Sequence, residues 1–169
     1  MLIGANSAVP SGSVGGSAFE PAADNRNILS LGCTTTSNRN VATFRNPNNL
    51  VGTINVSGTT TGFNTSSDYR LKENVVTDWD ATSRLKQLKP SRFNFKADKD
   101  TTVDGFLAHE VQSIVPVAIN GEKDAVDKDG NPEYQGIDQS KLVPILTKSL
   151  QEALARIDTL EAEVTKLKG

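Results

Sequence analysis

The sequence predicts an α+β fold, in which a β-rich first part is followed by a small mixed domain and a long C-terminal helix. Three observations predict it: polar, turn-rich residues 1–66, charged residues gathered after them, and regularly spaced apolar residues from Val143 to Leu167. A chain of 169 residues has room for one or two domains. We place the boundary after residue 66 and treat 67–169 as the second domain.

Charge is distributed unevenly along the chain. Of the 18 basic and 20 acidic side chains, only five precede Ser67, and none of these is a lysine. The five are Glu20, Asp24, Arg26, Arg39 and Arg45. The net charge of −2 gives no electrostatic reason to expect nucleic acid or an anionic membrane as a partner.

The first 66 residues are rich in Gly, Asn, Ser and Thr, and their apolar residues come in short pieces. Three pieces favour strands, and a turn at residues 46–49 separates the last two; they are Asn27–Leu31, Val41–Phe44 and Leu50–Val56. Such pieces are too short to build a core within one chain, and disorder is the alternative. The alternation from Val51 to Val56 favours strands whose apolar face packs against neighbouring chains.

Two short helices are expected in the second domain. Residues 80–88 have helical spacing, either Asp78 or Asp80 can cap them, and Pro90 follows their end. Residues 109–115 form the second expected helix, which Pro116 ends.

Strands are expected around these helices. Residues 92–96 alternate polar and aromatic side chains, which predicts a half-buried strand, and residues 103–108 are read as another strand. Residues 117–138 contain two turn signals, Asn120-Gly121 and a cluster around Gly130, and therefore predict a hairpin.

The C-terminal part has the strongest pattern, which predicts a helix over about 138–168. Its apolar residues follow alternating steps of three and four, as in a coiled coil: Val143, Leu146, Leu150, Ala153, Ile157, Leu160, Val164 and Leu167. In a parallel coil Arg156 would face Glu161 of a neighbour, and Glu163 would face Lys168. Pro144 lacks an N–H group, so residues 138–143 could form a separate turn. The alternative is one amphipathic helix lying on its own domain.

Ser67 and Lys72 form a candidate catalytic pair at the domain boundary. A hydroxyl nucleophile beside a lysine base is what a Ser-Lys hydrolase needs, although a polar surface loop would also contain both residues. Five residues apart, they lie about 140° apart on a helix and on opposite faces of a strand. Either the chain turns sharply between them, or the lysine comes from another subunit.

Three stretches resemble a known family in their order along the chain. They are SDYRLKEN at residues 67–74, GFLAHEVQ at residues 105–112 and YQGIDQSKLVP at residues 134–144. Together they resemble the C-terminal intramolecular chaperone domain of phage tailspikes and tail fibres, of the endosialidase type. The resemblance covers residues 67–169.

The resemblance implies a homotrimer that folds an upstream fibre or tailspike stalk and then cuts itself free between Ser66 and Ser67. Residues 1–66 would be the end of a trimeric β-stalk that stays in the virion, and the precursor would be assembled in the host cytoplasm. A heptad with β-branched residues at a and Leu at d leans towards dimers, but Leu154 at an e position widens the apolar stripe. The alternative function is a permanent, non-enzymatic trimerisation or host-binding tip.

Four further polar residues are candidates for the surroundings of the cleavage bond. Asp68 and Asn74 could orient Lys72 or donate to an oxyanion. His109 and Glu110 lie in the second matching stretch, which makes them candidates for the same surroundings, while a structural role at a helix start is the alternative for His109.

No cofactor or metal is expected. Asp127, Asp129 and Asn131 suggest a calcium loop, but the glycine is fourth where an EF-hand has it sixth, and position twelve is Asp138. One histidine and one cysteine make neither a zinc cluster nor a disulfide framework. No membrane span is expected, and the start of the chain, Met1–Asn6, does not read as a signal peptide.

Overall fold

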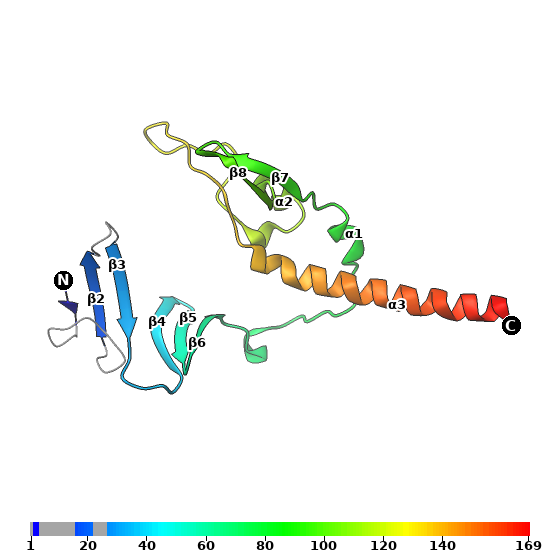
Figure 1. Cartoon of the computed structure of the whole chain (residues 1–169), viewed down its shortest axis with the longest axis horizontal. Coiled ribbons are helices and arrows are strands. Elements are labelled where there is room, and N and C mark those ends of the chain that lie inside the picture. The colour runs from blue at the N-terminus through cyan, green and yellow to red at the C-terminus, as the bar shows by residue number, and fades with distance from the viewer. Residues whose placement is uncertain (1, 4–15, 22–26) are drawn as a thin grey trace. The chain divides into compact units, whose positions relative to one another are not determined.

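The computed structural model describes residues 2–3, 16–21 and 27–169 (Figure 1). The chain packs into two compact units, residues 1–75 and residues 76–169. The domain boundary predicted after residue 66 lies within the first of these units and stays a prediction. The expectation about a signal peptide rests on residues 1–6, of which only Leu2 and Ile3 lie within the described part.

The first unit contains two antiparallel sheets of three strands each. One has the order β1-β2-β3, and the other has the order β4-β5-β6. Their bounds are β1 Leu2–Ile3, β2 Gly16–Pro21, β3 Asn27–Gly32, β4 Arg39–Asn46, β5 Asn49–Ser57 and β6 Thr60–Thr65. The three predicted strand pieces fall on β3, β4 and β5, and the turn between β4 and β5 lies where it was predicted.

The β4-β5-β6 sheet leaves aromatic side chains exposed on one face and carries amides on the other. Phe44 is 54% exposed and Phe63 is 79% exposed. The other face carries a chain of amides: Asn64 Nδ2 donates to Asn55 Oδ1 at 2.5 Å, and Asn55 Nδ2 donates to Asn38 Oδ1 at 2.8 Å. None of the side chains described in this unit is fully buried, so its sheets form no core of their own within the described part.

The second unit combines short helices, two-stranded sheets and one long helix, which confirms the α+β class. Its elements are α1 Thr82–Leu85, β7 Ser91–Phe95, β8 Asp98–Gly105, α2 Ala108–Gln112, η2 Pro116–Ala118, β9 Ile119–Asn120, β10 Gly136–Ile137, η3 Gln139–Leu142 and α3 Val143–Lys168. β7 pairs antiparallel with β8, and β9 pairs antiparallel with β10.

One small hydrophobic core holds this unit together. Its buried residues come from the segments that flank α1, from α2 and the residues after it, from η2 and η3, and from the start of α3: Ala81, Leu88, Val111, Val115, Ala118, Leu142 and Ile145. Trp79, the only tryptophan, packs against this cluster, and the Arg84 guanidinium lies 5.7 Å from the centre of its ring. Trp79 fluorescence is therefore a direct probe of this core.

The expected elements of the second unit exist, with shifted ends. α1 is a single turn, and Asp80 rather than Asp78 caps it, because the Ser83 N–H donates to Asp80 Oδ1 at 2.9 Å. β8 begins at Asp98, earlier than predicted, and ends at Gly105, because the chain then turns inward and Phe106 packs on the core. α2 starts one residue before the predicted helix and stops at Gln112.

The predicted hairpin over residues 117–138 is present, with β9 and β10 as its arms and a long loop between them. In this loop the Asp127 carboxylate accepts hydrogen bonds from the backbone N–H groups of Asp129, at 2.8 Å, and Asn131, at 2.9 Å. The Asn131 side chain also donates to Asp127, and it is the main cause that lowers the Asp127 pKa. The Asp127 oxygens thus stabilise the loop itself, and the described residues contain no cluster of three or more metal-ligating side chains.

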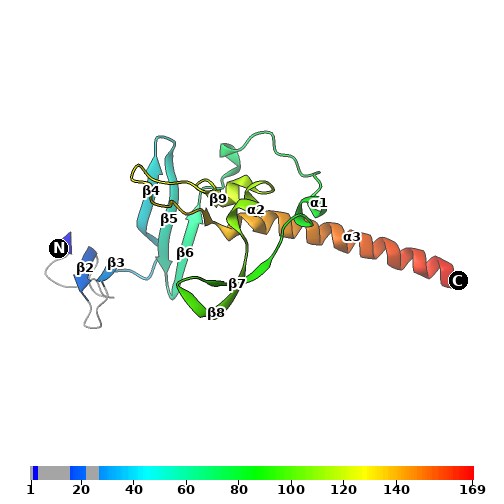
Figure 2. The same cartoon turned by 90° about the horizontal axis from the view of Figure 1, so that it is seen from above.

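α3 begins with Pro144 in its first turn, and η3 before it is the separate turn that Pro144 allows. The regularly spaced apolar residues from Val143 to Leu167 form a stripe along α3, the α3 seam. This seam is only partly covered, since Leu150 is 61% exposed and Ile157 is 48% exposed. In Figures 1 and 2 the C-terminal half of α3 extends past the other elements of the second unit. The coiled coil stays a prediction. None of the described helices is long and apolar enough to cross a membrane.

A carboxylate on α3 caps the start of α1. Glu152 accepts hydrogen bonds from the backbone N–H groups of Ala81, at 3.2 Å, and Thr82, at 2.9 Å, and from the Thr82 hydroxyl at 2.5 Å. Free N–H groups at a helix start favour a negative charge. The hydrogen bond from the Thr82 side chain is the main cause that lowers the pKa of Glu152.

Glu152→Gln is expected to make the second unit less sensitive to acid. A carboxylate with a lowered pKa stabilises the fold above its unfolded pKa, and this stability is lost as the pH falls through the folded pKa. Glutamine does not titrate, so the urea midpoint of Trp79 fluorescence should fall less between about pH 7 and about pH 3 than in the wild-type chain. Glu133→Gln is the matched control, because the exposed Glu133 side chain makes no described hydrogen bond. An equal acid loss in wild type and Glu152→Gln would contradict the prediction.

Candidate active site at Ser67 and Lys72

The site begins where the β4-β5-β6 sheet ends. Ser66 follows β6, its backbone N–H donates to the Val51 carbonyl at 3.1 Å, and its hydroxyl donates to the Leu50 carbonyl at 3.0 Å. Ser66 is therefore the last residue that hydrogen bonds attach to β5, and the peptide bond to Ser67 comes directly after it. These bonds fix Ser66, whose carbonyl group belongs to the predicted cleavage bond.

A single 3₁₀ turn, η1 (Tyr69–Leu71), follows. The Leu71 N–H donates to the Asp68 carbonyl at 3.1 Å, and the Lys72 N–H donates to the Tyr69 carbonyl at 3.0 Å. The turn brings Lys72 Nζ to 2.8 Å from Ser67 Oγ, to which it donates a hydrogen bond. Of the two routes left open by the sequence, this chain takes the sharp turn, and the lysine and serine meet within one chain.

The Asp68 side chain caps this turn and is held by Arg70. It accepts from the Arg70 backbone N–H and from Arg70 Nε, both at 2.9 Å, and from Arg70 Nη2 at 2.8 Å. The Arg70 side chain is the main cause that lowers the Asp68 pKa, and the charge of Lys72 adds a smaller effect. Asp68 thus bonds to Arg70, not to Lys72, and any orienting effect on Lys72 is indirect.

Asn74 turns the chain after the pair. Its φ of 52° lies in the left-handed region, which asparagine tolerates better than most residues. Its side chain makes no hydrogen bond within the described part of the chain, and its role at an oxyanion stays a prediction.

Three large side chains close to the pair in the sequence are exposed in the single chain. Tyr69 is 80% exposed, Leu71 is 72% exposed and Val75 is 73% exposed. To act as a base a lysine must give up its proton, and burial is the usual way to favour its neutral form. A partner that covered these side chains would also bury the pair.

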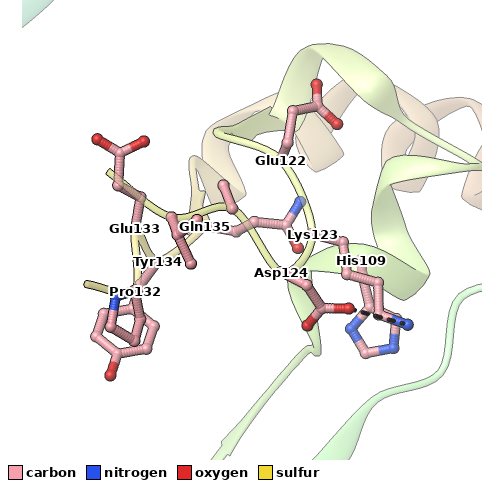
Figure 3. Close-up of a pocket in the computed structure, with 10 residues that line it drawn as sticks. His109, Glu122, Lys123, Asp124, Pro132, Glu133, Tyr134 and Gln135 are labelled. Carbon is pink, nitrogen blue, oxygen red and sulfur yellow. Dashed lines mark ion pairs between the residues drawn. The ribbon is translucent and has the colours of Figure 1, made fainter. Parts of the chain in front are cut away.

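His109 and Glu110 lie on α2 in the second unit. The exposed His109 lines an open cavity of about 460 Å³ together with residues 122–126 and 132–135 of the long loop (Figure 3). In the same cavity Lys123 Nζ lies 4.0 Å from Asp124 Oδ2, and both side chains are largely exposed. Glu110 pairs with Lys89 at 3.3 Å. The roles of His109 and Glu110 around the cleavage bond stay predictions.

Residues 66–74 thus place a serine hydroxyl and a lysine amine in hydrogen-bond contact directly after a residue that the sheet holds. Residues 67–120 match the family model of peptidase S74, described as chaperone of endosialidase. The match starts at Ser67 and includes the first two resembling stretches, which confirms the predicted resemblance over this segment. No curated protein matches the chain.

Sequence reasoning missed the role of Arg70 and the way in which Ser66, already predicted at the cleavage bond, is anchored. Arg70 lies two positions after Asp68, within reach of a side chain that caps a turn, and this spacing was the available signal. The anchoring of Ser66 on β5 depends on the register of β5 with β6, in which Gly52 pairs with Thr65, and no local pattern reveals it.

Proposed function

We propose that this chain is the end of a phage tail fibre or tailspike with its intramolecular chaperone, which trimerises, folds the fibre and then cuts itself away between Ser66 and Ser67. The contact of 2.8 Å between Lys72 Nζ and Ser67 Oγ, at the first residue of the family match, carries the proposal. Cleavage would leave residues 1–66 in the virion fibre and release residues 67–169 after assembly in the host cytoplasm.

The proposed reaction uses only groups of this chain and water. Neutral Lys72 takes the Ser67 hydroxyl proton while Oγ attacks the carbonyl carbon of Ser66. The proton then passes to the Ser67 nitrogen as the C–N bond breaks, which leaves an ester between Ser66 and Ser67 Oγ. Water hydrolyses the ester to a Ser66 carboxylate and a free amino terminus on Ser67. Nearby backbone N–H groups that are not already bonded within the turn are the proposed donors to the oxyanion.

The exposed seam of α3 supports self-association. Leu150, Ile157 and Leu160 remain 43–61% exposed, and α1 and α3 form an apolar groove around Leu146 and Leu150. Two further copies of α3 are the proposed occupants.

The second candidate is a permanent trimerisation or host-binding tip without chemistry. The exposure of the Ser67–Lys72 pair in the single chain favours it, because an exposed lysine is a poor base.

A denaturing gel of the purified chain tests the proposal, with the mass of each band measured. Cleavage gives fragments of 66 and 103 residues, the larger beginning at Ser67. A single intact band from a trimeric sample supports the permanent tip. A cut at any other bond overturns the proposed mechanism.

A further inference from the structure

The residues around Lys72 present an unexpected pairing. Asp68 precedes the 3₁₀ turn and Lys72 follows it, and the charge of Lys72 contributes, after Arg70, to the lowered pKa of Asp68. In the structure, however, Lys72 donates a hydrogen bond to Ser67, and Arg70 donates two side-chain hydrogen bonds to Asp68. A planar guanidinium forms such a two-pronged bond with a carboxylate better than an ammonium does.

We propose that Arg70 is a positioning residue of the Ser67–Lys72 pair, which keeps the Asp68 carboxylate occupied so that it does not draw Lys72 into an ion pair. An ion pair between Asp68 and Lys72 would take the lysine from Ser67 and hold the proton on it. Arg70 prevents both by occupying the two carboxylate oxygens. This inference rests on the proposed function, because it concerns the base of that reaction.

Few charged side chains besides Lys72 are present in the described residues 27–75. They are Arg39 and Arg45 on β4, Asp68 and Arg70 in the turn, and Glu73 next to Lys72 in the sequence. Arg45 donates to the Asn49 side chain and Arg39 to the Asn38 carbonyl. Glu73 makes no ion pair in the described chain, and Asp68 is the acid whose pKa responds to Lys72. Asp68 is therefore the carboxylate that Arg70 has to control.

The test is the pH dependence of self-cleavage in four chains: wild type, Arg70→Gln, Asp68→Asn and the double variant. Arg70→Gln frees the carboxylate, which favours the protonated lysine. The pH midpoint of the cleavage rate should rise by about one unit, so that cleavage near neutral pH slows by about tenfold. In the double variant the carboxylate is gone, while the amide oxygen of the introduced asparagine still accepts the capping bond. The midpoint should therefore return to that of Asp68→Asn.

Arg70→Lys is the conservative variant. It should shift the pH midpoint of cleavage less than Arg70→Gln does, because lysine keeps the positive charge although it cannot form the two-pronged hydrogen bond of a guanidinium. A purely structural role would slow cleavage at every pH without moving the midpoint, and Asp68→Asn would not rescue it. That result, or an unchanged midpoint in Arg70→Gln, overturns the inference. An uncut wild-type chain overturns the proposed function instead, so the two failures are distinguishable.

Discussion

Ser67→Ala is expected to leave the chain whole, with cleavage slowed roughly 10⁴-fold or more. The hydroxyl supplies the electrons for the new bond, and no other described hydroxyl is placed like it. Ser66, the neighbouring serine, donates its hydroxyl to the Leu50 carbonyl and is held on the sheet. Ser66→Ala is therefore the matched control, and this variant should still be cut before Ser67. The gel and the fragment masses give the result.

Lys72→Ala should also prevent cleavage, by the factor of about 10²–10⁴ that a general base supplies. Both variants should remain assembled, because neither residue lies on the α3 seam. Normal processing of Ser67→Ala would show that Ser67 is not the nucleophile. Normal processing of Lys72→Ala, with Ser67→Ala blocked, would instead assign the base to another group.

Local chemistry made much of the second unit predictable. Pro144 marked the turn before α3, and the structure adds that the Asp138 carboxylate caps η3 by accepting from the Ser140 N–H at 3.0 Å. Alternation predicted β7, in which Phe93 is half-buried as expected, while Phe95 is 63% exposed because the register with β8 shifts after Asn94. In each case a few neighbouring residues determine the conformation.

Long-range contacts were not predictable in this way. Glu152 reaches the start of α1 from 70 positions further along the chain, and nothing near Glu152 or Thr82 signals that contact. β6 was missed because its sequence, TTGFNT, has a single large apolar residue. It forms a strand because β5 offers it a partner edge.

The candidate site lies between these cases. The residue types of Ser67 and Lys72 suggested the chemistry, but their spacing alone fits neither helix nor strand. Their contact depends on one 3₁₀ turn, which Asp68 caps and Arg70 locks. Such a turn needs only a cap residue and two backbone bonds, a weaker sequence signal than a heptad.

Ile157→Asp is expected to abolish both assembly and cleavage. Ile157 lies at an a position in the exposed part of α3, where a coiled coil would bury it. Losing its burial costs about 2 kcal/mol per chain, hence about 6 kcal/mol per trimer, and a buried carboxylate adds to this cost. Sedimentation equilibrium at micromolar concentration should find three chains for the wild type and one for the variant.

Ala162→Asp is the control for helix propensity, because Ala162 lies in the same helix on the side opposite the seam. This variant should stay trimeric and cut itself, since only the helix itself is weakened, by less than about 1 kcal/mol. If Ile157→Asp were still trimeric, α3 would not be the surface through which the chains assemble. A monomeric Ile157→Asp that still cuts itself would separate the two steps: the Ser67–Lys72 turn would then be a complete active site in one chain, and burial by neighbours would not be what triggers it.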